Sequence, residues 1–588
     1  MNAIAKWPKS LKAPRLAPVQ PYAASTDRRV TLIAASLSRL IAFLTLTLAA
    51  LMLCTPARAD TLIDNVNGIT IGKDGAMVRF AAILIDDAGR VRATYRKGER
   101  MPRINGPRID GKGRTLMPGL VDAHLHVMGL GFGALTLDLS DTKTLAEAQE
   151  KIRRFAADNP TRPWILGRGW NQEIWGLGRF PTAAELDAAV GDRPVWLERV
   201  DGHAAWANSA ALRIAKVDKA TKDPAGGRIE RDAAGNPSGI FVDAASELVA
   251  RVVPTPRAAE RDLALFKAQE ILHSFGITAA ADMGTTIEDW QTFRRAGDGG
   301  RLTVRIMSYA AGVDAMDLIG GSGPTPWLYN DRLRLNGVKL YLDGALGSRG
   351  AWLKAPYADD SGNRGLQLID SAKLRNWMSR AALGRFQVAV HAIGDAADAE
   401  ILEAIAELAP SYDGDRRWRI EHAQIVDPAD LRMFGQHGII ASMQPVHQTS
   451  DRLMAGVRLG EARLTGAYAW RSIAQTGAIL AFGSDAPVES PDPFAGFAAA
   501  ISRTDRAGEP AGGWLPQERV TREQALAGYT SAAAFAGFGD GRFGRLVPGE
   551  WADFVLIDTD PMMATPAQLY ATKVRETWIA GKPVYRAE

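Results

Sequence analysis

Eight short apolar runs, rich in β-branched residues, are spaced along the middle of the chain. From the second run onward, stretches with helical spacing separate them, such as the one from Ala396 to Leu408. Strands that alternate with helices predict an α/β fold with a parallel sheet, and eight such strands predict a closed (β/α)8 TIM barrel. The predicted strands are residues 119–126, 276–282, 304–309, 337–343, 387–393, 418–424, 439–445 and 479–485.

Different patterns flank and interrupt the predicted barrel, which would span residues 118–535. Residues 60–117 alternate short apolar runs with Gly, Asp and Asn turns, which predicts a small antiparallel sheet. Residues 536–588 have the same texture, so both chain ends could pair into one small β-sandwich. The gap between the first two strands is too long for one crossover. It predicts an insertion at about 140–255, rich in Trp, Gly and Pro, that covers the barrel mouth.

The first 59 residues have the pattern of an export signal. Basic residues that include Arg28 and Arg29 precede an apolar stretch over residues 40–54, and Ala57-Arg58-Ala59 has the small-x-small form of a cleavage site. The pattern predicts a signal peptide over residues 1–59 and export to the periplasm by a Sec or twin-arginine route. A retained membrane anchor is the alternative, but the apolar stretch is short for a membrane span.

Charge and cysteine content narrow the chemistry of the mature chain. The leader contains eight Lys and Arg residues and one Asp. The formal net charge of +4 therefore comes from the leader, and the chain after residue 59 is net negative. The charge therefore gives no reason to expect a nucleic-acid partner. The single cysteine, Cys54, also lies in the leader. The mature chain would have no disulfide or thiolate zinc site, and it would hold any metal through nitrogen and oxygen.

Metal-ligating side chains occur at the ends of the predicted barrel strands. His124 and His126 would project from one face of the first strand, because residues i and i+2 of a strand point the same way. Catalytic residues of such barrels lie at the C-terminal strand ends. Each residue alone would fit a hydrogen-bonded core position or a turn, but together they predict a metal site at one rim. The set is His124, His126, Lys339, His391, His422 and Asp485.

Lys339 is the unusual member of this set, because it lies inside an apolar run. A buried ammonium beside divalent cations would be repelled and costly to desolvate. A neutral lysine amine can instead add CO₂, and the resulting carbamate is an anion that can bridge two metal ions. This interpretation makes chemical sense only if the site holds two metals.

Several segments together resemble the amidohydrolase superfamily. The match extends to amidohydrolase family 3, the group that contains the N-substituted formamide deformylases. The superfamily landmarks are residues 118–126, Lys339, 391–395, 421–424, 483–487 and 544–553, and the narrower matches are 169–172, 201–203 and 339–348. The resemblance covers nearly everything after residue 60, and it implies a metal-dependent (β/α)8 barrel with a small β-sandwich.

The resemblance also implies a role for each site residue. It implies two divalent metal ions, with zinc expected, and a carboxylated Lys339 that bridges them. His124, His126 and Asp485 would bind the more buried ion, and His391 and His422 would bind the other. Asp485 would also move the proton of the attacking water.

Histidines outside this ligand set have less certain roles. His203 follows Asp201-Gly202 in the insertion; the family match suggests contact with the substrate or the oxyanion, and a structural hydrogen bond is the alternative. The remaining histidines, His273, His437 and His447, are interpreted as structural. Arg349, just past the fourth strand, would suit a substrate that carries a carboxylate.

The predicted function is metal-dependent hydrolysis of a carbon–nitrogen bond other than a peptide bond, in an amide, formamide-like or N-acyl substrate. One alternative is a hydrolase of esters, lactones or carbamates with the same binuclear site. A second alternative is an exported, non-catalytic ligand-binding protein. The predicted partners are a small-molecule substrate and, in a homodimer, a second copy of the chain. Neither nucleic acid nor stable membrane insertion after signal cleavage is expected.

Overall fold

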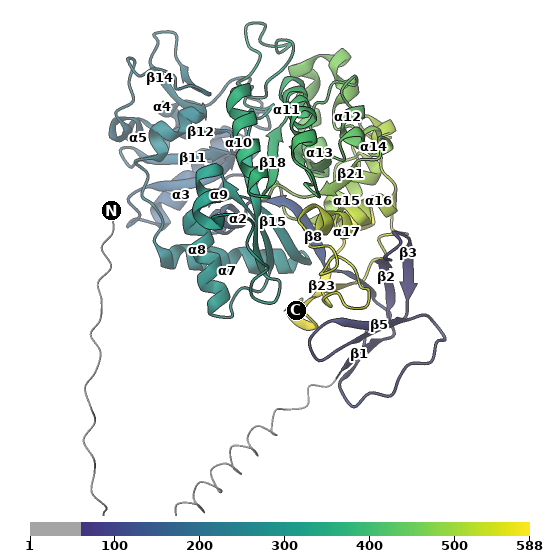
Figure 1. The fold of residues 1–588 in the computed structure, drawn as a ribbon. Coiled ribbons are helices and arrows are strands. Elements are labelled where there is room, and N and C mark those ends of the chain that lie inside the picture. Colours follow the sequence, from purple (N-terminus) through teal and green to yellow (C-terminus); the bar gives the residue numbers. More distant parts are fainter. Residues whose placement is uncertain (1–59) are drawn as a thin grey trace, which may run out of the picture. The chain divides into compact units, whose positions relative to one another are not determined.

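The computed structural model describes residues 60–588, and an eight-stranded parallel sheet forms its centre (Figure 1). Its strands follow one another in chain order, as expected for a (β/α)8 barrel. They are β8 (Leu120–Leu125), β15 (Ile277–Thr285), β16 (Arg305–Ala311), β17 (Leu333–Tyr341), β18 (Gln387–Ala392), β19 (Arg419–His422), β20 (Ile440–Met443) and β21 (Ile479–Phe482). Each predicted strand coincides with one of them, so the predicted fold class is confirmed. The predicted leader lies outside the described residues.

Helices lie between the barrel strands and cover the sheet (Figure 1). The main ones are α7 (Ala258–Ser274), α8 (Ile287–Asp298), α9 (Val313–Gly320), α10 (Ser371–Leu383), α11 (Asp395–Leu408), α12 (Arg432–Gln436), α13 (Pro445–Leu459), α14 (Trp470–Gln475) and α15 (Pro493–Ser502). Within residues 60–588, none of the helices combines the length and apolar character that a membrane span requires.

Side-chain parity explains which strand residues face the barrel interior. Ala279 and Ala281 of β15 and Ala389 of β18 belong to an inner cluster, where small side chains fit. Val338 and Leu340 of β17 belong instead to the cluster that packs under the helices. Since successive strand residues alternate between faces, Lys339 must point into the barrel.

Both ends of the described chain contribute to one six-stranded sheet. Strand β22 (Phe554–Ile557) pairs with β7 (Thr115–Pro118), and the sheet order is β24-β23-β22-β7-β2-β3. The other strands are β2 (Asn67–Ile71), β3 (Met77–Phe80), β23 (Val574–Ile579) and β24 (Lys582–Arg586). A four-stranded sheet of β5 (Val91–Tyr95), β4 (Ala82–Ile85), β1 (Thr61–Asp64) and β6 (Arg108–Asp110) shares its apolar core.

One detail of the predicted sandwich is wrong. Both sheets are mixed and not purely antiparallel, because β1 pairs with β6 and β2 pairs with β7 in parallel. Parallel pairing needs a crossover longer than a hairpin turn, and the segments between these strands supply it. The exact domain boundaries stay predictions.

The insertion after β8 has a six-stranded sheet of its own. Its strands are β9 (Leu137–Asp138), β10 (Ile165–Trp170), β11 (Val195–Arg199), β12 (Ala204–Ala207), β13 (Gly227–Arg231) and β14 (Pro237–Asp243). Its helices are α3 (Leu145–Asp158), α4 (Ala183–Val190) and α5 (Ser209–Ala215). Trp170 and Trp175 pack edge-to-face against Trp206, with ring centroids 6.1 and 6.2 Å apart, so these indoles build the core of the insertion.

Candidate metal centre

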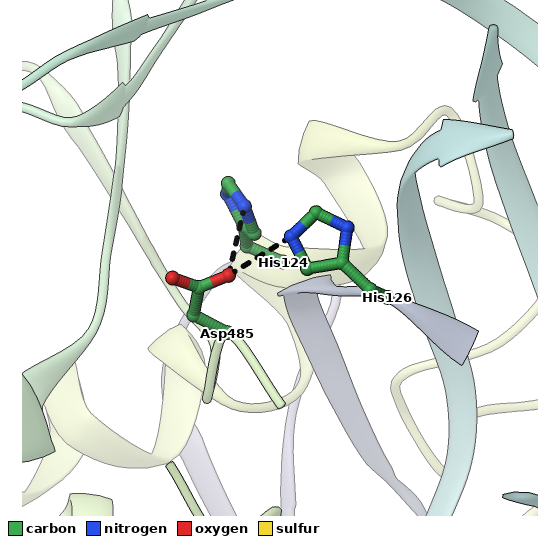
Figure 2. A group of neighbouring side chains, drawn as sticks. All are labelled: His124, His126 and Asp485. Carbon is green, nitrogen blue, oxygen red and sulfur yellow. Dashed lines mark ion pairs between the residues drawn. The ribbon is translucent and has the colours of Figure 1, made fainter. Parts of the chain in front are cut away.

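The first group of candidate ligands lies where β8 ends. Figure 2 shows His124 and His126 turned toward the carboxylate of Asp485. Oδ1 of Asp485 lies 3.4 Å from Nε2 of His124 and 3.2 Å from Nε2 of His126. The β8–β15 register steps from Asp122 opposite Ala280 to Leu125 opposite Asp282, so a bulge there sets the direction of His124.

A buried carboxylate fixes the tautomer of His124. Oε2 of Glu421 lies 2.7 Å from Nδ1 of His124, and both side chains are fully buried. The carboxylate accepts a hydrogen bond from Nδ1–H of His124, which leaves the lone pair of Nε2 directed at Asp485. Arg419 donates to Glu421 through Nε at 2.7 Å and Nη2 at 3.1 Å, so the carboxylate is held in turn.

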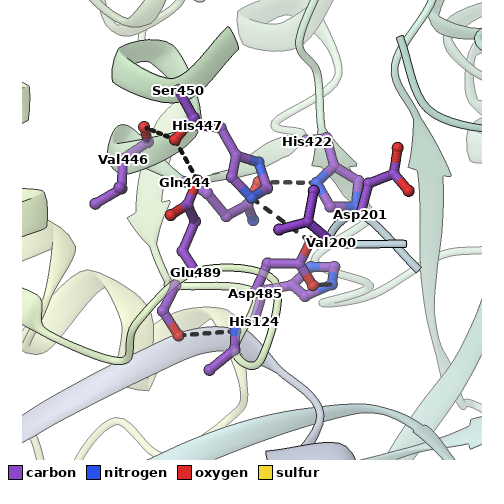
Figure 3. A network of polar contacts seen from close by, with 12 residues as sticks. His124, Val200, Asp201, His422, Gln444, Val446, His447, Ser450, Asp485 and Glu489 are labelled. Atoms are coloured by element: carbon purple, nitrogen blue, oxygen red, sulfur yellow. Dashed lines mark hydrogen bonds and ion pairs between the residues drawn. The ribbon is translucent and has the colours of Figure 1, made fainter. Parts of the chain in front are cut away.

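The second group brings His422 at the end of β19 and His447 in the first turn of α13 to the same aspartate (Figure 3). His422, His447 and Asp485 place potential ligand atoms within 4.8 Å of one another. Nδ1 of His422 donates to Oε1 of Gln444 at 2.8 Å, which leaves Nε2 free for a ligand. His422 and Asp485 have φ values of 75° and 58°, in the left-handed region that residues other than glycine rarely adopt. His391 joins this group, since its ring centroid lies 4.5 Å from that of His422.

Lys339 lies beside the first group and faces the barrel interior. Its Nζ is 3.3 Å from Nε2 of His124 and 4.9 Å from the ring centroid of Tyr341. Burial lowers the pKa of Lys339 to about 8, although Glu421 and Asp485 oppose the shift. A neutral amine is therefore accessible at mild pH, as the addition of CO₂ requires.

Burial also sets the charge of the other candidate ligands. It lowers the pKa values of His124, His391 and His422 well below the ordinary range, which keeps these imidazoles neutral. Burial alone would raise the pKa of Asp485, but the nearby His126 imidazole opposes this effect and the pKa is lowered. Neutral imidazole and ionised carboxylate are the forms that bind metal ions.

The donor set fits a metal ion. Nε2 of His391, Nε2 of His447 and Oδ1 of Asp485 are buried and have no hydrogen-bond partner within residues 60–588. The Nε2 lone pair of His124 faces a carboxylate oxygen, and two acceptors so close repel each other unless a cation lies between them. Nitrogen and oxygen ligands of this kind suit zinc and other divalent first-row metals.

Two cavities meet at this cluster. The larger, about 680 Å³, is lined by all six predicted ligands and by residues of the insertion. The smaller, about 410 Å³, extends toward α13. Both are lined by Asp201, His203, His391, His422 and Asp485.

His203 reaches both cavities from the insertion. Its Nδ1 lies 2.7 Å from Oδ1 of Asp243, and its ring centroid is 4.9 Å from that of His391. Burial would lower the pKa of His203, but the hydrogen bond and charge of Asp243 outweigh it and raise the pKa to about 9. The imidazole is therefore charged at neutral pH, unlike its neighbours. Its predicted contact with the substrate stays a prediction.

The structure changes the interpretation of two other predicted residues and agrees with that of a third. His447, predicted as structural, lies in the cluster, 3.7 Å from Oδ2 of Asp485. The sequence pattern missed it because it lies four residues beyond β20, on α13. Arg349 does not line either described cavity and forms an ion pair with Asp359 instead. His273 is structural as predicted, since its two nitrogens contact the Ile277 carbonyl oxygen and Oγ1 of Thr303.

A (β/α)8 barrel that gathers buried histidines, a lysine and an aspartate at its strand ends has the architecture of a metal-dependent hydrolase. The model of the amidohydrolase family matches residues 108–585. The chain therefore belongs to the amidohydrolase family, and the predicted resemblance is confirmed.

Individual relatives agree with this assignment. Protein LONG AFTER FAR-RED 3 of Arabidopsis thaliana is 36% identical over 81% of this chain and 83% of its own length. Putative amidohydrolase YtcJ of Bacillus subtilis (strain 168) is 32% identical over 86% of this chain and 96% of its own. N-substituted formamide deformylase of Arthrobacter pascens is 27% identical over 80% of this chain and 89% of its own length. The crystal structure of an uncharacterized metal-dependent hydrolase from Pyrococcus horikoshii OT3 has a TM-score of 0.70 at 25% identity and covers 86% of this chain and 99% of its own.

Proposed function

We propose that the protein binds two divalent metal ions, preferably zinc, and that Lys339 carries a CO₂-derived carbamate between them. One observation carries this proposal: six predicted ligands from five barrel strands or strand ends line one cavity, and two of their buried polar atoms, Nε2 of His391 and Oδ1 of Asp485, lack hydrogen-bond partners within residues 60–588. His124, His126 and Asp485 would hold one ion. His391 and His422 would hold the other, with His447 close enough to assist.

The proposed reaction is hydrolysis of a carbon–nitrogen bond in an amide, formamide-like or N-acyl substrate. Membership of the amidohydrolase family and the similarity to a formamide deformylase support this choice. The bound metal ions would supply Lewis-acid polarisation of the carbonyl and acidify water. The ionised carboxylate of Asp485 would take the proton of the attacking water and pass it to the leaving nitrogen.

His203 would assist as a cationic hydrogen-bond donor. Asp243 holds its Nδ1–H, so Nε2–H is left to donate to the substrate oxygen as negative charge develops there. We also propose, from the sequence alone, that residues 1–59 direct export and that the mature enzyme works in the periplasm.

The test combines metal analysis with turnover of matched substrates. We expect about two zinc ions per chain after purification without chelator, and the added mass of one CO₂ on Lys339. A panel of formamides and N-acyl amines should be hydrolysed, and Asp485→Asn should lower kcat by roughly 100-fold or more. No metal uptake with added zinc and bicarbonate would contradict the metal centre. Turnover of esters or lactones alone would contradict the proposed bond specificity.

A further inference from the structure

The smaller cavity is built on one face of α13. His447, Ser450, Asp451 and Met454 all line it. Residues separated by three, four and seven positions share a helix face, so this part of α13 presents one continuous wall to the cavity. His447 lines this cavity, and its Nε2 lies 3.7 Å from Oδ2 of Asp485 in the candidate metal centre (Figure 3). A substrate bound at the metals can therefore extend one arm along α13.

Two carboxylates that line this cavity, Asp451 on α13 and Glu489 beyond β21, have no Lys or Arg ion-pair partner within residues 60–588. Oδ2 of Asp451 accepts hydrogen bonds from Nε2 of Gln424 at 2.6 Å and from the Tyr468 hydroxyl at 2.7 Å. Glu489 accepts a hydrogen bond from the Ser450 hydroxyl. Neither carboxylate forms an ion pair with a Lys or Arg within residues 60–588. Burial raises the pKa of both carboxyl groups, because it disfavours their ionised forms. A bound cation would offset this effect.

The basic side chains around the cavity do not neutralise this pair. Arg199 is buried and committed to other groups, since it donates to Asp201 and to Oε1 of Gln172. Lys143 also lines the cavity, but its side chain is exposed at the rim. His203 also lines the cavity and is charged, but its Nδ1 is held by Asp243. Asp451 and Glu489 therefore have no direct ion-pair partner among these basic side chains.

His447 connects this cavity with the candidate metal centre. His447 is only 9% exposed and lines the cavity, yet its Nε2 has no hydrogen-bond partner in the described chain. A buried polar atom of this kind is costly unless a ligand or ion completes it.

We propose that the smaller cavity binds a positively charged group of the substrate, a primary ammonium or a guanidinium, through Asp451 and Glu489. The substrate would then be an amide with a cationic arm on one side of the scissile bond. This proposal rests on the proposed function, and it names Asp451 and Glu489 as specificity-determining residues.

The turnover test uses formamides that differ in one group. N-(4-aminobutyl)formamide carries an ammonium where N-pentylformamide carries a methyl group. We expect wild-type kcat/KM to favour the ammonium substrate by at least roughly tenfold, since hydrogen bonds to charged groups contribute about 1.5–3 kcal/mol. Asp451→Asn and Glu489→Gln should each lower this ratio about tenfold or more. Asp192→Asn, in a side chain that is 97% exposed on the insertion, is the matched control and should keep the ratio.

A binding measurement separates this proposal from the proposed function. Calorimetry of the metal-loaded enzyme would compare pentylammonium, pentanol and pentanoate. Tighter binding of pentylammonium to wild type than to Asp451→Asn supports the proposal even if no amide is hydrolysed. Equal binding of pentylammonium to both proteins, or tighter binding of pentanol than of pentylammonium to wild type, overturns it even if amides are hydrolysed. Thermal melting checks that the variants fold. If Asp451→Asn does not fold, the same comparison is made with Glu489→Gln.

Discussion

Glu421→Gln is expected to weaken metal binding at His124 as well as the fold. The Glu421 carboxylate serves three donors: Nδ1 of His124, and Nε and Nη2 of Arg419. The glutamine amide has one oxygen that can accept hydrogen bonds, whereas the carboxylate has two. Either His124 loses its acceptor, or the Arg419 guanidinium loses part of its partner in a fully buried position.

Both effects can be given a size. Breaking a buried ion pair from one side costs about 3–5 kcal/mol, and the substituted amide would keep part of the interaction, so we expect a loss of about 3 kcal/mol in unfolding free energy. Removing the acceptor that orients a metal-binding histidine typically lowers metal affinity about 10–100-fold. Reduced affinity is expected because Nδ1–H would no longer be held by an anion, which makes Nε2 of His124 a weaker donor.

The two effects need separate assays. Competition with a chromophoric chelator gives the metal affinity, and urea unfolding in excess chelator gives the stability of the metal-free protein. Glu150→Gln, in an exposed ion pair on α3, is the control. Metal affinity within about twofold of wild type, together with lower stability, would refute the reasoning, because Glu421 would then support the fold alone.

Two further predictions concern buried titratable groups. Lys339→Met should lack the added CO₂ mass and bind about one metal ion fewer per chain, and metal analysis with intact-mass measurement checks this; full occupancy would contradict a bridging carbamate. Burial lowers the pKa of His273 to about 4 in the folded protein. As pH falls from about 6.5 toward 4, this histidine takes up a proton in the unfolded chain but not in the folded one, which should remove up to about 3 kcal/mol of stability. Urea unfolding across that range should show a shallower pH dependence for His273→Gln, and an unchanged slope would contradict the assignment.

Strand patterns predicted the parts of the site that follow from regular geometry. Lys339 and His391 lie within β17 and β18, where parity alone directs a side chain inward or outward. The apolar runs around them are long enough to identify the strands from sequence. Their meeting point then follows from the closed barrel, because the C-terminal ends of all eight strands share one rim.

The remaining parts depend on geometry that a pattern does not encode. Parity would place His422 on the face opposite Glu421, but its positive φ turns the chain at the end of β19. His447 reaches the cluster from a helix, so no strand pattern could include it. Asp451 and Glu489 become neighbours of the same cavity only after α13 and the segment past β21 have packed.

The location of the centre ties metal binding to closure of the barrel. Asp122 in β8 accepts hydrogen bonds from the backbone of His124 at 3.0 Å and from Oγ of Ser484 at 2.6 Å. The Asp485 amide donates to the His124 carbonyl at 2.7 Å, so the first and last strands are joined through the ligands themselves. A Cβ on Gly483 would lie 2.5 Å from the His124 nitrogen, which explains why the chain has glycine at this close approach. Forming this seam and bringing His124 to Asp485 are therefore one structural event.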